Sequence, residues 1–325
     1  MEGYLGIDVG SVTTKLGVLN ESLELEASVY LLTRGNPIAA LQEGLSQIRK
    51  ALPAGFEMRG AATTGSARYL AGVVIGADLV KNEITSHAVA ALHYVPEVRA
   101  ILEIGGQDSK IIIIKDGIVI DFGMNTVCAA GTGSFLDHQA LRLNMSIEEL
   151  STRALDSCNP VRIAGRCTVF AESDMIHKQQ MGHALEDIVY GLCQALVRNY
   201  LNNVGSGKDI QSPVVFQGGV AFNKGIVKAF QEELNTDITV LPHHELMGAI
   251  GAALLVHDEI AAHEKESNFR GFGISDTEYS TSSFSCQECP NQCEIAQVAV
   301  RDQVLARYGG RCDRYETGEV PLQVS

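Results

Sequence analysis

The chain has little positive charge and no long apolar run. Its 325 residues include 25 Lys and Arg against 39 Asp and Glu, a formal net charge of -14. This acidic balance argues against nonspecific binding to nucleic acid or to an anionic membrane surface. The longest apolar run, Met247 to Val256, is far shorter than the span of about 20 residues that a membrane helix needs. The first residues, Met1 to Tyr4, do not resemble a secretory signal, so we expect a cytoplasmic protein.

The remaining composition is that of a globular protein with a sizeable core. Hydrophobic residues make up 46% and charged residues 20% of the chain. The length favours two domains or slightly more. In a reducing compartment, the eight cysteines indicate metal binding or redox chemistry more than disulfide bonds.

Hydrophobic periodicity and turn signals predict the same arrangement twice. Within each copy, glycines, hydroxyl residues and an Asp occupy the turn between the first two strands. We therefore expect an α/β chain with a duplicated unit, in which two phosphate-sized loops face one another across a cleft. The predicted strands are 4–9, 13–19, 25–32 and 57–63 in the first copy, and 100–104, 110–115, 118–122, 214–217 and 239–241 in the second. The expected domains are residues 1–97, residues 98–262 with their last helix packed on the first half, and residues 263–325.

One segment of the second copy carries both a thiol and a glycine turn. Cys128 stands three residues before Gly131-Thr132-Gly133, and an apolar periodic run typical of a helix follows. Such a turn points backbone N–H groups and the positive end of the helix dipole outward, which favours phosphate. The segment is therefore predicted to contact a nucleotide and a metal cluster together. A third glycine turn, Gly218-Gly219, separates a buried strand from a helix that begins near Asn223.

These motifs resemble a known family. The chain resembles the ATP-dependent activators of 2-hydroxyacyl-CoA dehydratases and the related ATPase subunits of benzoyl-CoA reductases, which share the duplicated ribonuclease-H-like fold of actin, sugar kinases and heat-shock ATPases. The resemblance runs from about Tyr4 to Ile260. The motifs that carry it are Gly6 to Lys15, Ile104 to Lys110, Asn125 to Phe135, Cys167 to Glu172 and Gln217 to Val220.

The resemblance implies ATP or ADP with Mg²⁺ as cofactors. Asp8 is expected to hold Mg²⁺ through water, while Gln107 and Asp108 position the attacking water. Adenine contacts are expected near Glu245 to Gly248, with His243 and His244 in a solvated loop. The other residues expected to bind the nucleotide are Gly10, Ser11, Thr13, Thr14, Lys15, Gly105, Gly106, Gly131, Thr132 and Gly133 at the phosphates, and Gly218, Gly219 and Asn223 at the nucleoside. Glu103 departs from the Asp that many family members have.

The same resemblance implies that Cys128 and Cys167 are iron ligands. Two thiolates cannot complete a [4Fe–4S] cluster, which normally takes four. A two-fold homodimer supplies the other pair, because each subunit presents the same patch across the interface. The electron donor is then a ferredoxin or flavodoxin, and the acceptor is a dehydratase or reductase component.

A polar tail follows the family resemblance. The Ser- and Thr-rich stretch 277–285 is predicted to be a linker. Cys286, Cys289, Cys293 and Cys312 follow it at spacings that fit a four-thiolate site for zinc or for an iron–sulfur cluster.

The function expected from the sequence is an ATP-hydrolysing iron–sulfur activator that passes a low-potential electron to a partner dehydratase or reductase. One alternative is a sugar or small-molecule kinase of the same superfamily, which requires no iron. The other is a zinc-bearing regulatory module with slow or absent hydrolysis. The cysteine pair argues against the kinase, and the intact phosphate loops argue against the regulator.

Overall fold

The computed structural model describes residues 1–263, 265–300 and 303–315 and divides into two units. Unit 1 comprises Met1–Ala90 with Gly248–Ser325, and unit 2 comprises Ala91–Met247. Each unit contains one five-stranded mixed sheet with its own hydrophobic core. In the described part of the chain, no helix is long and apolar enough to span a membrane.

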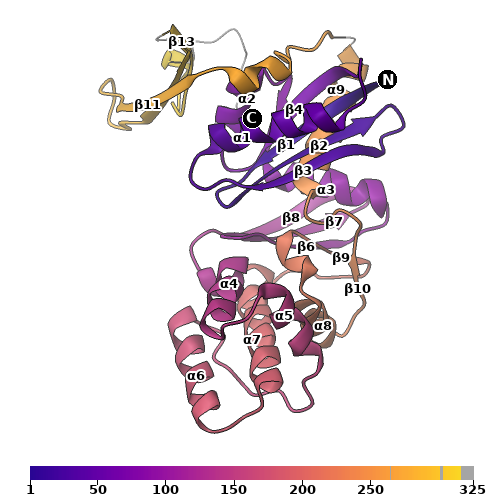
Figure 1. The fold of residues 1–325 in the computed structure, drawn as a ribbon, viewed down its shortest axis with the longest axis vertical. Coiled ribbons are helices and arrows are strands. Elements are labelled where there is room, and N and C mark those ends of the chain that lie inside the picture. The colour runs from indigo at the N-terminus through magenta and orange to yellow at the C-terminus, as the bar shows by residue number, and fades with distance from the viewer. Residues whose placement is uncertain (264, 301–302, 316–325) are drawn as a thin grey trace. The chain divides into compact units, whose positions relative to one another are not determined.

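The sheet of unit 1 is built from β1 (Glu2–Val9), β2 (Thr13–Asn20), β3 (Leu25–Leu32), β4 (Glu57–Thr64) and β5 (Leu79–Val80), in the order β3-β2-β1-β4-β5 (Figure 1). The pairs β1–β2 and β2–β3 are antiparallel, whereas β1–β4 and β4–β5 are parallel. The helices of this unit are α1 (Pro37–Ala51), α2 (Arg68–Ile75), most of α3 (Glu83–Tyr94) and α9 (Met247–His263). At Gly6, α9 comes so close that an added Cβ would lie 1.8 Å from the carbonyl oxygen of Ala249. Only glycine allows this contact between strand and helix.

Unit 2 repeats the sheet of unit 1. Strands β6 (Ala100–Ile104), β7 (Ser109–Lys115), β8 (Ile118–Asn125), β9 (Val214–Gln217) and β10 (Ile238–Val240) have the order β10-β9-β6-β7-β8. Again the first two pairs along the chain are antiparallel, and β6–β9 and β9–β10 are parallel. The α/β class and the duplicated layout predicted from the sequence are therefore confirmed.

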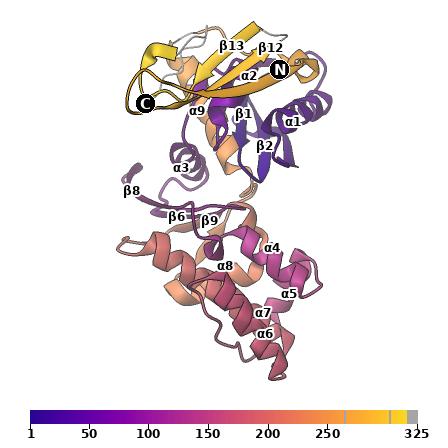
Figure 2. The same cartoon turned by 90° about the vertical axis from the view of Figure 1, so that its left-hand side faces the viewer.

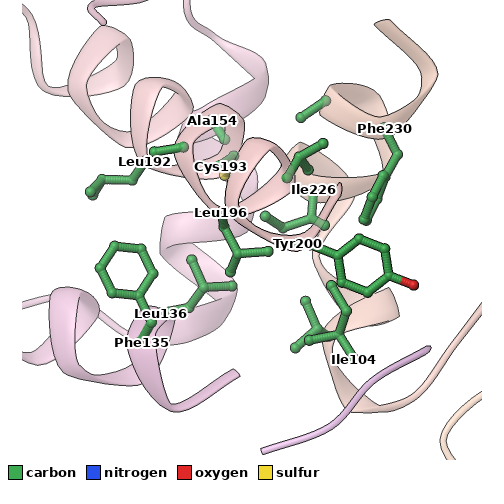
Figure 3. Packing of buried hydrophobic residues seen from close by; sticks show 14 of the residues in the cluster. Ile104, Phe135, Leu136, Ala154, Leu192, Cys193, Leu196, Tyr200, Ile226 and Phe230 are labelled. Carbon is green, nitrogen blue, oxygen red and sulfur yellow. The ribbon is translucent and has the colours of Figure 1, made fainter. Parts of the chain in front are cut away.

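Helices cover one side of the second sheet. They are α4 (Gly133–Arg142), α5 (Ile147–Leu155), α6 (Thr168–Gln180), α7 (Leu185–Tyr200) and α8 (Lys224–Leu234), with short turns η1 (Ala129–Gly131), η2 (Leu201–Gly205) and η3 (Gly219–Phe222). Both Figure 1 and Figure 2 show these five helices on the same side of β6 and β9. Helix α7 lies at the centre of the core (Figure 3), where Leu192, Leu196 and Tyr200 are buried. The rings of Tyr200 and Phe230 pack edge to face, with their centroids 5.3 Å apart.

The tail forms a third, smaller sheet of β11 (Tyr279–Ser285), β12 (Glu294–Val300) and β13 (Gln303–Tyr308), with short turns η4 (Phe272–Asp276) and η5 (Asp313–Tyr315). The prediction of a linker at 277–285 is wrong, because this stretch is a strand hydrogen-bonded to β12. Val298 and Ala306 of the sheet belong to the same core cluster as Val73 and Val74 of α2. Burial of these apolar side chains holds the tail sheet against unit 1.

Within Met1–Ala90 of unit 1, helix α2 and strand β5 are absent from the sequence expectations. Helix α2 has only eight residues, and its N-cap residue, Ala67, makes no side-chain capping hydrogen bond. It ends at Gly76, whose φ is 70°. Strand β5 contains two residues. Short elements without a capping residue leave little periodic signal, since tertiary packing supplies most of their stability.

Candidate functional site

Asp8 and Lys15 face one another across the first two strands. They are register partners of β1 and β2, and the Lys15 Nζ lies 3.0 Å from the Asp8 Oδ2. Between them the chain turns tightly, with the Gly10 N–H donating to the Thr13 carbonyl at 2.9 Å. The loop that contains Ser11 therefore has a carboxylate and an ammonium group at its base.

Two glycines leave room around the carboxylate of Asp8. A Cβ on Gly65 would lie 2.6 Å from the Asp8 Oδ1, and a Cβ on Gly248 would lie 2.7 Å from the Asp8 Oδ2. Any larger residue at either position would displace the carboxylate. Gly65 also has a φ of 94°, a backbone conformation that residues with side chains rarely adopt. The sequence reasoning did not identify Gly65 as part of the site.

The first loop of unit 2 has the same construction. Glu103 and Lys110 are register partners of β6 and β7, and the Lys110 Nζ lies 3.0 Å from the Glu103 Oε2. The Gly105 N–H donates to the Asp108 carbonyl at 3.0 Å, as Gly10 donates in unit 1. The two loops therefore repeat each other residue by residue. Glu103 stands where unit 1 has Asp8.

Lys110 is a central residue of this loop that the sequence reasoning missed. Its buried ammonium group also contacts the Asp108 Oδ2 at 2.8 Å. Burial alone would lower the pKa of Lys110, but the carboxylates of Glu103 and Asp108 raise it above its ordinary value. Lys110 is therefore charged and holds both acidic side chains in place. Its signal was the internal repeat, because it corresponds to Lys15.

The glycine turn after Cys128 is hydrogen-bonded to this loop. The Gly133 N–H donates to the Gly105 carbonyl, and the Ser134 N–H donates to the Gly106 carbonyl, both at 2.9 Å. Thr132 is buried, and its hydroxyl donates to the Ala129 carbonyl at 2.8 Å. The beginning of α4 is therefore fixed to the Gly105–Gly106 turn.

The third glycine turn, Gly218-Gly219, packs against strand β6. Gly218 has φ 88°, and an added Cβ would lie 2.4 Å from the Ile104 carbonyl oxygen. Its N–H donates to the His244 carbonyl at 2.9 Å, and a ring nitrogen of His244 lies 3.0 Å from the Gly218 oxygen. The solvated loop expected at His244 is wrong, because His244 is buried. Gly219 begins η3.

Asn223 lies at the start of α8. Its side-chain oxygen accepts the Ile226 N–H at 3.1 Å, which caps the helix. Its amide nitrogen is buried and has no hydrogen-bond partner among the described residues. A buried donor of this kind is available to a ligand.

Cys128 lies in a loop held by two asparagines. The Cys128 N–H donates to the Asn125 side-chain oxygen at 2.9 Å, and the Asn125 amide donates to the Cys128 carbonyl at 2.8 Å. The thiol itself lies 3.9 Å from the Asn199 Oδ1. Cys128 is half-buried and immediately precedes η1.

The loop before Cys167 is also contacted by Asn199 of helix α7. Cys167 is the N-cap residue of α6, and two residues before it the Gly165 carbonyl accepts the Asn199 amide at 2.5 Å. Asn199 of α7 therefore contacts both cysteine loops. It was not predicted, although a polar residue within the apolar run of α7 was a signal.

Exposed apolar side chains flank both cysteines in the sequence, together with the exposed Arg166. Val127 is 93% exposed and Leu141 76% exposed, and Val169 and Phe170 follow Cys167 by two and three residues with 66% and 65% exposure. Among the described residues there is no group of three or more His, Cys, Asp and Glu side chains that could hold a metal ion. One chain thus supplies two thiols in these loops, those of Cys128 and Cys167.

The other six cysteines lie in three different environments. Cys193 is fully buried in α7, and burial raises its pKa to about 12. Cys158 is exposed between α5 and α6. The four tail cysteines line one cavity at the end of the third sheet.

The chain is similar to several known proteins over most of its length. It is 34% identical over 264 residues, 81% of this chain and 97% of the relative, to a 2-hydroxyisocaproyl-CoA dehydratase activator of Clostridioides difficile. It is 35% identical over 262 residues, 79% of this chain and 98% of the relative, to an (R)-2-hydroxyglutaryl-CoA dehydratase activating ATPase of Acidaminococcus fermentans.

A solved structure of the C. difficile activator with bound ADPNP matches with a TM-score of 0.73 and 33% identity, over 81% of this chain and 97% of that chain. The model of the BadF/BadG/BcrA/BcrD ATPase family matches residues 5–256. The match includes both glycine-containing loop repeats, Cys128 and Cys167, and ends before the tail sheet. The chain belongs to the BadF/BadG/BcrA/BcrD ATPase family.

Proposed function

We propose that this protein is an ATP-hydrolysing activator that receives one low-potential electron and delivers it to a partner dehydratase or reductase. The observation that carries the proposal is the short segment from Cys128 to Ser134, which has a thiol at one end and hydrogen bonds to the Gly105–Gly106 turn at the other. The relatives named as dehydratase activators support the class of partner.

The nucleotide residues fit ATP with Mg²⁺. The Asp8 carboxylate is the hard oxygen ligand that Mg²⁺ prefers, and Gly65 and Gly248 leave space beside it. Bound Mg²⁺ supplies charge neutralisation at the phosphates. Lys110 holds Asp108 in position, and Gln107 and Asp108 together orient the attacking water. The buried Asn223 amide provides a donor for the nucleoside. The other proposed nucleotide-binding residues remain those expected from the sequence.

Cys128 and Cys167 fit an iron–sulfur cluster shared by two copies of the chain. Their thiolates are soft ligands of the kind that bind iron–sulfur clusters, and two copies provide four. The exposed Val127, Leu141 and Phe170 favour a second copy at this surface, because a two-fold interface brings the same apolar patch together. A bound cluster supplies storage for one electron, received from a ferredoxin or flavodoxin.

The proposed coupling runs through α4. Hydrogen bonds from Gly133 and Ser134 tie α4 to the nucleotide loop, and the ion pair between Arg142 and Glu172 ties α4 to α6. A nucleotide-dependent shift of the loop therefore moves both cysteine-bearing segments. The shift requires that ATP and ADP have different affinities for the two arrangements, because equal affinity changes no population.

Metal analysis of three variants tests the proposal. The protein is purified anaerobically as wild type, Cys128→Ala, Cys167→Ala and the control Cys158→Ala. We expect the first two variants to lose about four irons per dimer relative to wild type, while ADP affinity measured by calorimetry stays within about twofold. The control should keep its iron, because Cys158 is exposed and its N–H donates to the Asp187 side chain, outside both cysteine loops. Unchanged iron in Cys128→Ala would refute the cluster assignment.

A further inference from the structure

The three strands of the tail sheet bring four cysteines to one end of the sheet, where β11 ends, β12 begins and β13 ends. Ser285 at the end of β11 pairs with Glu294 at the start of β12, and the Cys286 N–H donates to the Cys293 carbonyl at 2.8 Å. Tyr308 at the end of β13 pairs with Ala296 near the start of β12, so β13 ends at the same end of the sheet. Cys289 lies in the turn between β11 and β12, and Cys312 follows β13.

Two tight turns hold the cysteine segments together. Gln292, next to Cys293, has φ 41°, and Gly309 has φ 102°. A Cβ on Gly309 would lie 2.6 Å from the Glu294 carbonyl oxygen. The chain that leads to Cys312 therefore passes directly beside the start of β12, and only glycine permits this approach.

All four cysteines line a single cavity of about 230 Å³. Cys286 is buried, Cys293 is half-buried, and Cys289 and Cys312 are exposed. Arg311 and Arg314 line the same cavity. Glu288 also lines this cavity and forms an ion pair with Arg314, so the charges around the thiols are mixed.

We propose that Cys286, Cys289, Cys293 and Cys312 bind a thiophilic metal centre, either one zinc ion or an iron–sulfur cluster. Four thiolates complete the ligand set of either centre within one chain. The thiols do not already stand in ligating geometry, because no group of three metal-binding side chains occurs among the described residues. Loading therefore draws the exposed Cys289 and Cys312 toward the buried Cys286.

The centre also stabilises the tail sheet. Val298 and Ala306 of the sheet are buried in the core cluster of unit 1, and Tyr279, Leu305 and Tyr308 pack against that cluster while partly exposed. Tyr308 packs near Tyr69 of α2, with ring centroids 6.3 Å apart. Metal bound at the open end of this small sheet adds to its folding free energy, because the site forms only in the folded chain. The family match ends at residue 256, so this site does not depend on the proposed function.

The test uses the full chain, purified anaerobically, with Cys128 and Cys167 both changed to Ala to remove the other thiol pair. Metal retained by this protein should disappear when Cys289→Ser and Cys312→Ser are added. Cys158→Ser, added instead, is the matched control and should leave the metal unchanged. About one zinc per chain identifies the zinc form, and iron with an equal amount of sulfide identifies the cluster form.

Cobalt(II) provides a second measurement that does not depend on the folding of a tail variant. Added to the metal-depleted Cys128→Ala, Cys167→Ala protein, it should produce the absorption bands of thiolate-bound cobalt. Hydrogen exchange in β11 to β13 should slow on loading. Absence of the cobalt bands, or metal that survives loss of Cys289 and Cys312, would overturn the proposal.

Discussion

The side-chain oxygen of Asn199 lies 3.9 Å from the Cys128 thiol, and the side-chain amide of Asn199 donates to the Gly165 carbonyl, two residues before Cys167. One buried residue of α7 therefore holds both loops that carry the proposed cluster ligands. Its two contacts connect loops that are distant in sequence. Its removal should affect both loops at once.

Asn199→Ala should loosen these loops together. Loss of the buried hydrogen bonds should lower the free energy of unfolding by about 1–3 kcal/mol. Hydrogen exchange should accelerate in both 125–131 and 163–167, and iron content should fall. The matched control is Asn202→Ala, which changes an exposed asparagine of η2. Acceleration in only one of the two loops would contradict the bridging role.

Lys110→Met should destabilise unit 2 strongly. The substitution leaves the buried Glu103 carboxylate without its cation, at a cost of about 3–5 kcal/mol. Urea unfolding followed by circular dichroism measures the change. Lys115→Met, at the exposed end of the same strand, should have little effect. Adding Glu103→Gln to Lys110→Met should recover part of the loss, and no recovery would argue against the ion pair as the cause.

Gly218→Ala should cost more than Gly182→Ala. Both glycines have a positive φ, 88° and 80°, so each substitution carries a backbone cost of roughly 1–2 kcal/mol. Only at Gly218 does the added Cβ meet the Ile104 carbonyl, whereas nothing lies within 4 Å at Gly182. Thermal unfolding and ADP binding should therefore be impaired in Gly218→Ala alone beyond the shared cost. Equal losses in the two variants would contradict the close packing of Gly218.

Cys193 should resist alkylation in the folded protein. Burial raises its pKa from 9.0 to about 12, so the folded state keeps the proton that the unfolded state releases. Its contribution to stability is full below about pH 9 and is lost as the pH rises towards 12. Iodoacetamide with mass spectrometry should label Cys158 in the native protein, but Cys193 only after unfolding. Rapid native labelling of Cys193 would disprove its burial.

The repeated sheet was predictable because each copy contains strand-length apolar runs separated by glycine turns. Gly218 and Gly105 were visible for the same reason. Asn199 was missed because its partners, Cys128 and Gly165, lie far away along the chain. Lys110 was missed although its partners Glu103 and Asp108 are near in sequence, because the repeat was not used to align it with Lys15. Helix α2 lacks a capping side chain, and β11 is rich in Ser and Thr because its side chains are largely exposed. Composition therefore indicated a linker where backbone pairing with β12 forms a strand.

The central claim is that nucleotide and cluster are coupled through the segment from Cys128 to Ser134. The most direct measurement is electron paramagnetic resonance of the dithionite-reduced protein with ATP, with ADP and without nucleotide. Tail substitutions at Cys289 and Cys312 remove any second centre from the spectrum. We predict a signal that requires both Cys128 and Cys167 and that differs between the ATP and ADP samples. A cluster signal identical under all three conditions would contradict the coupling.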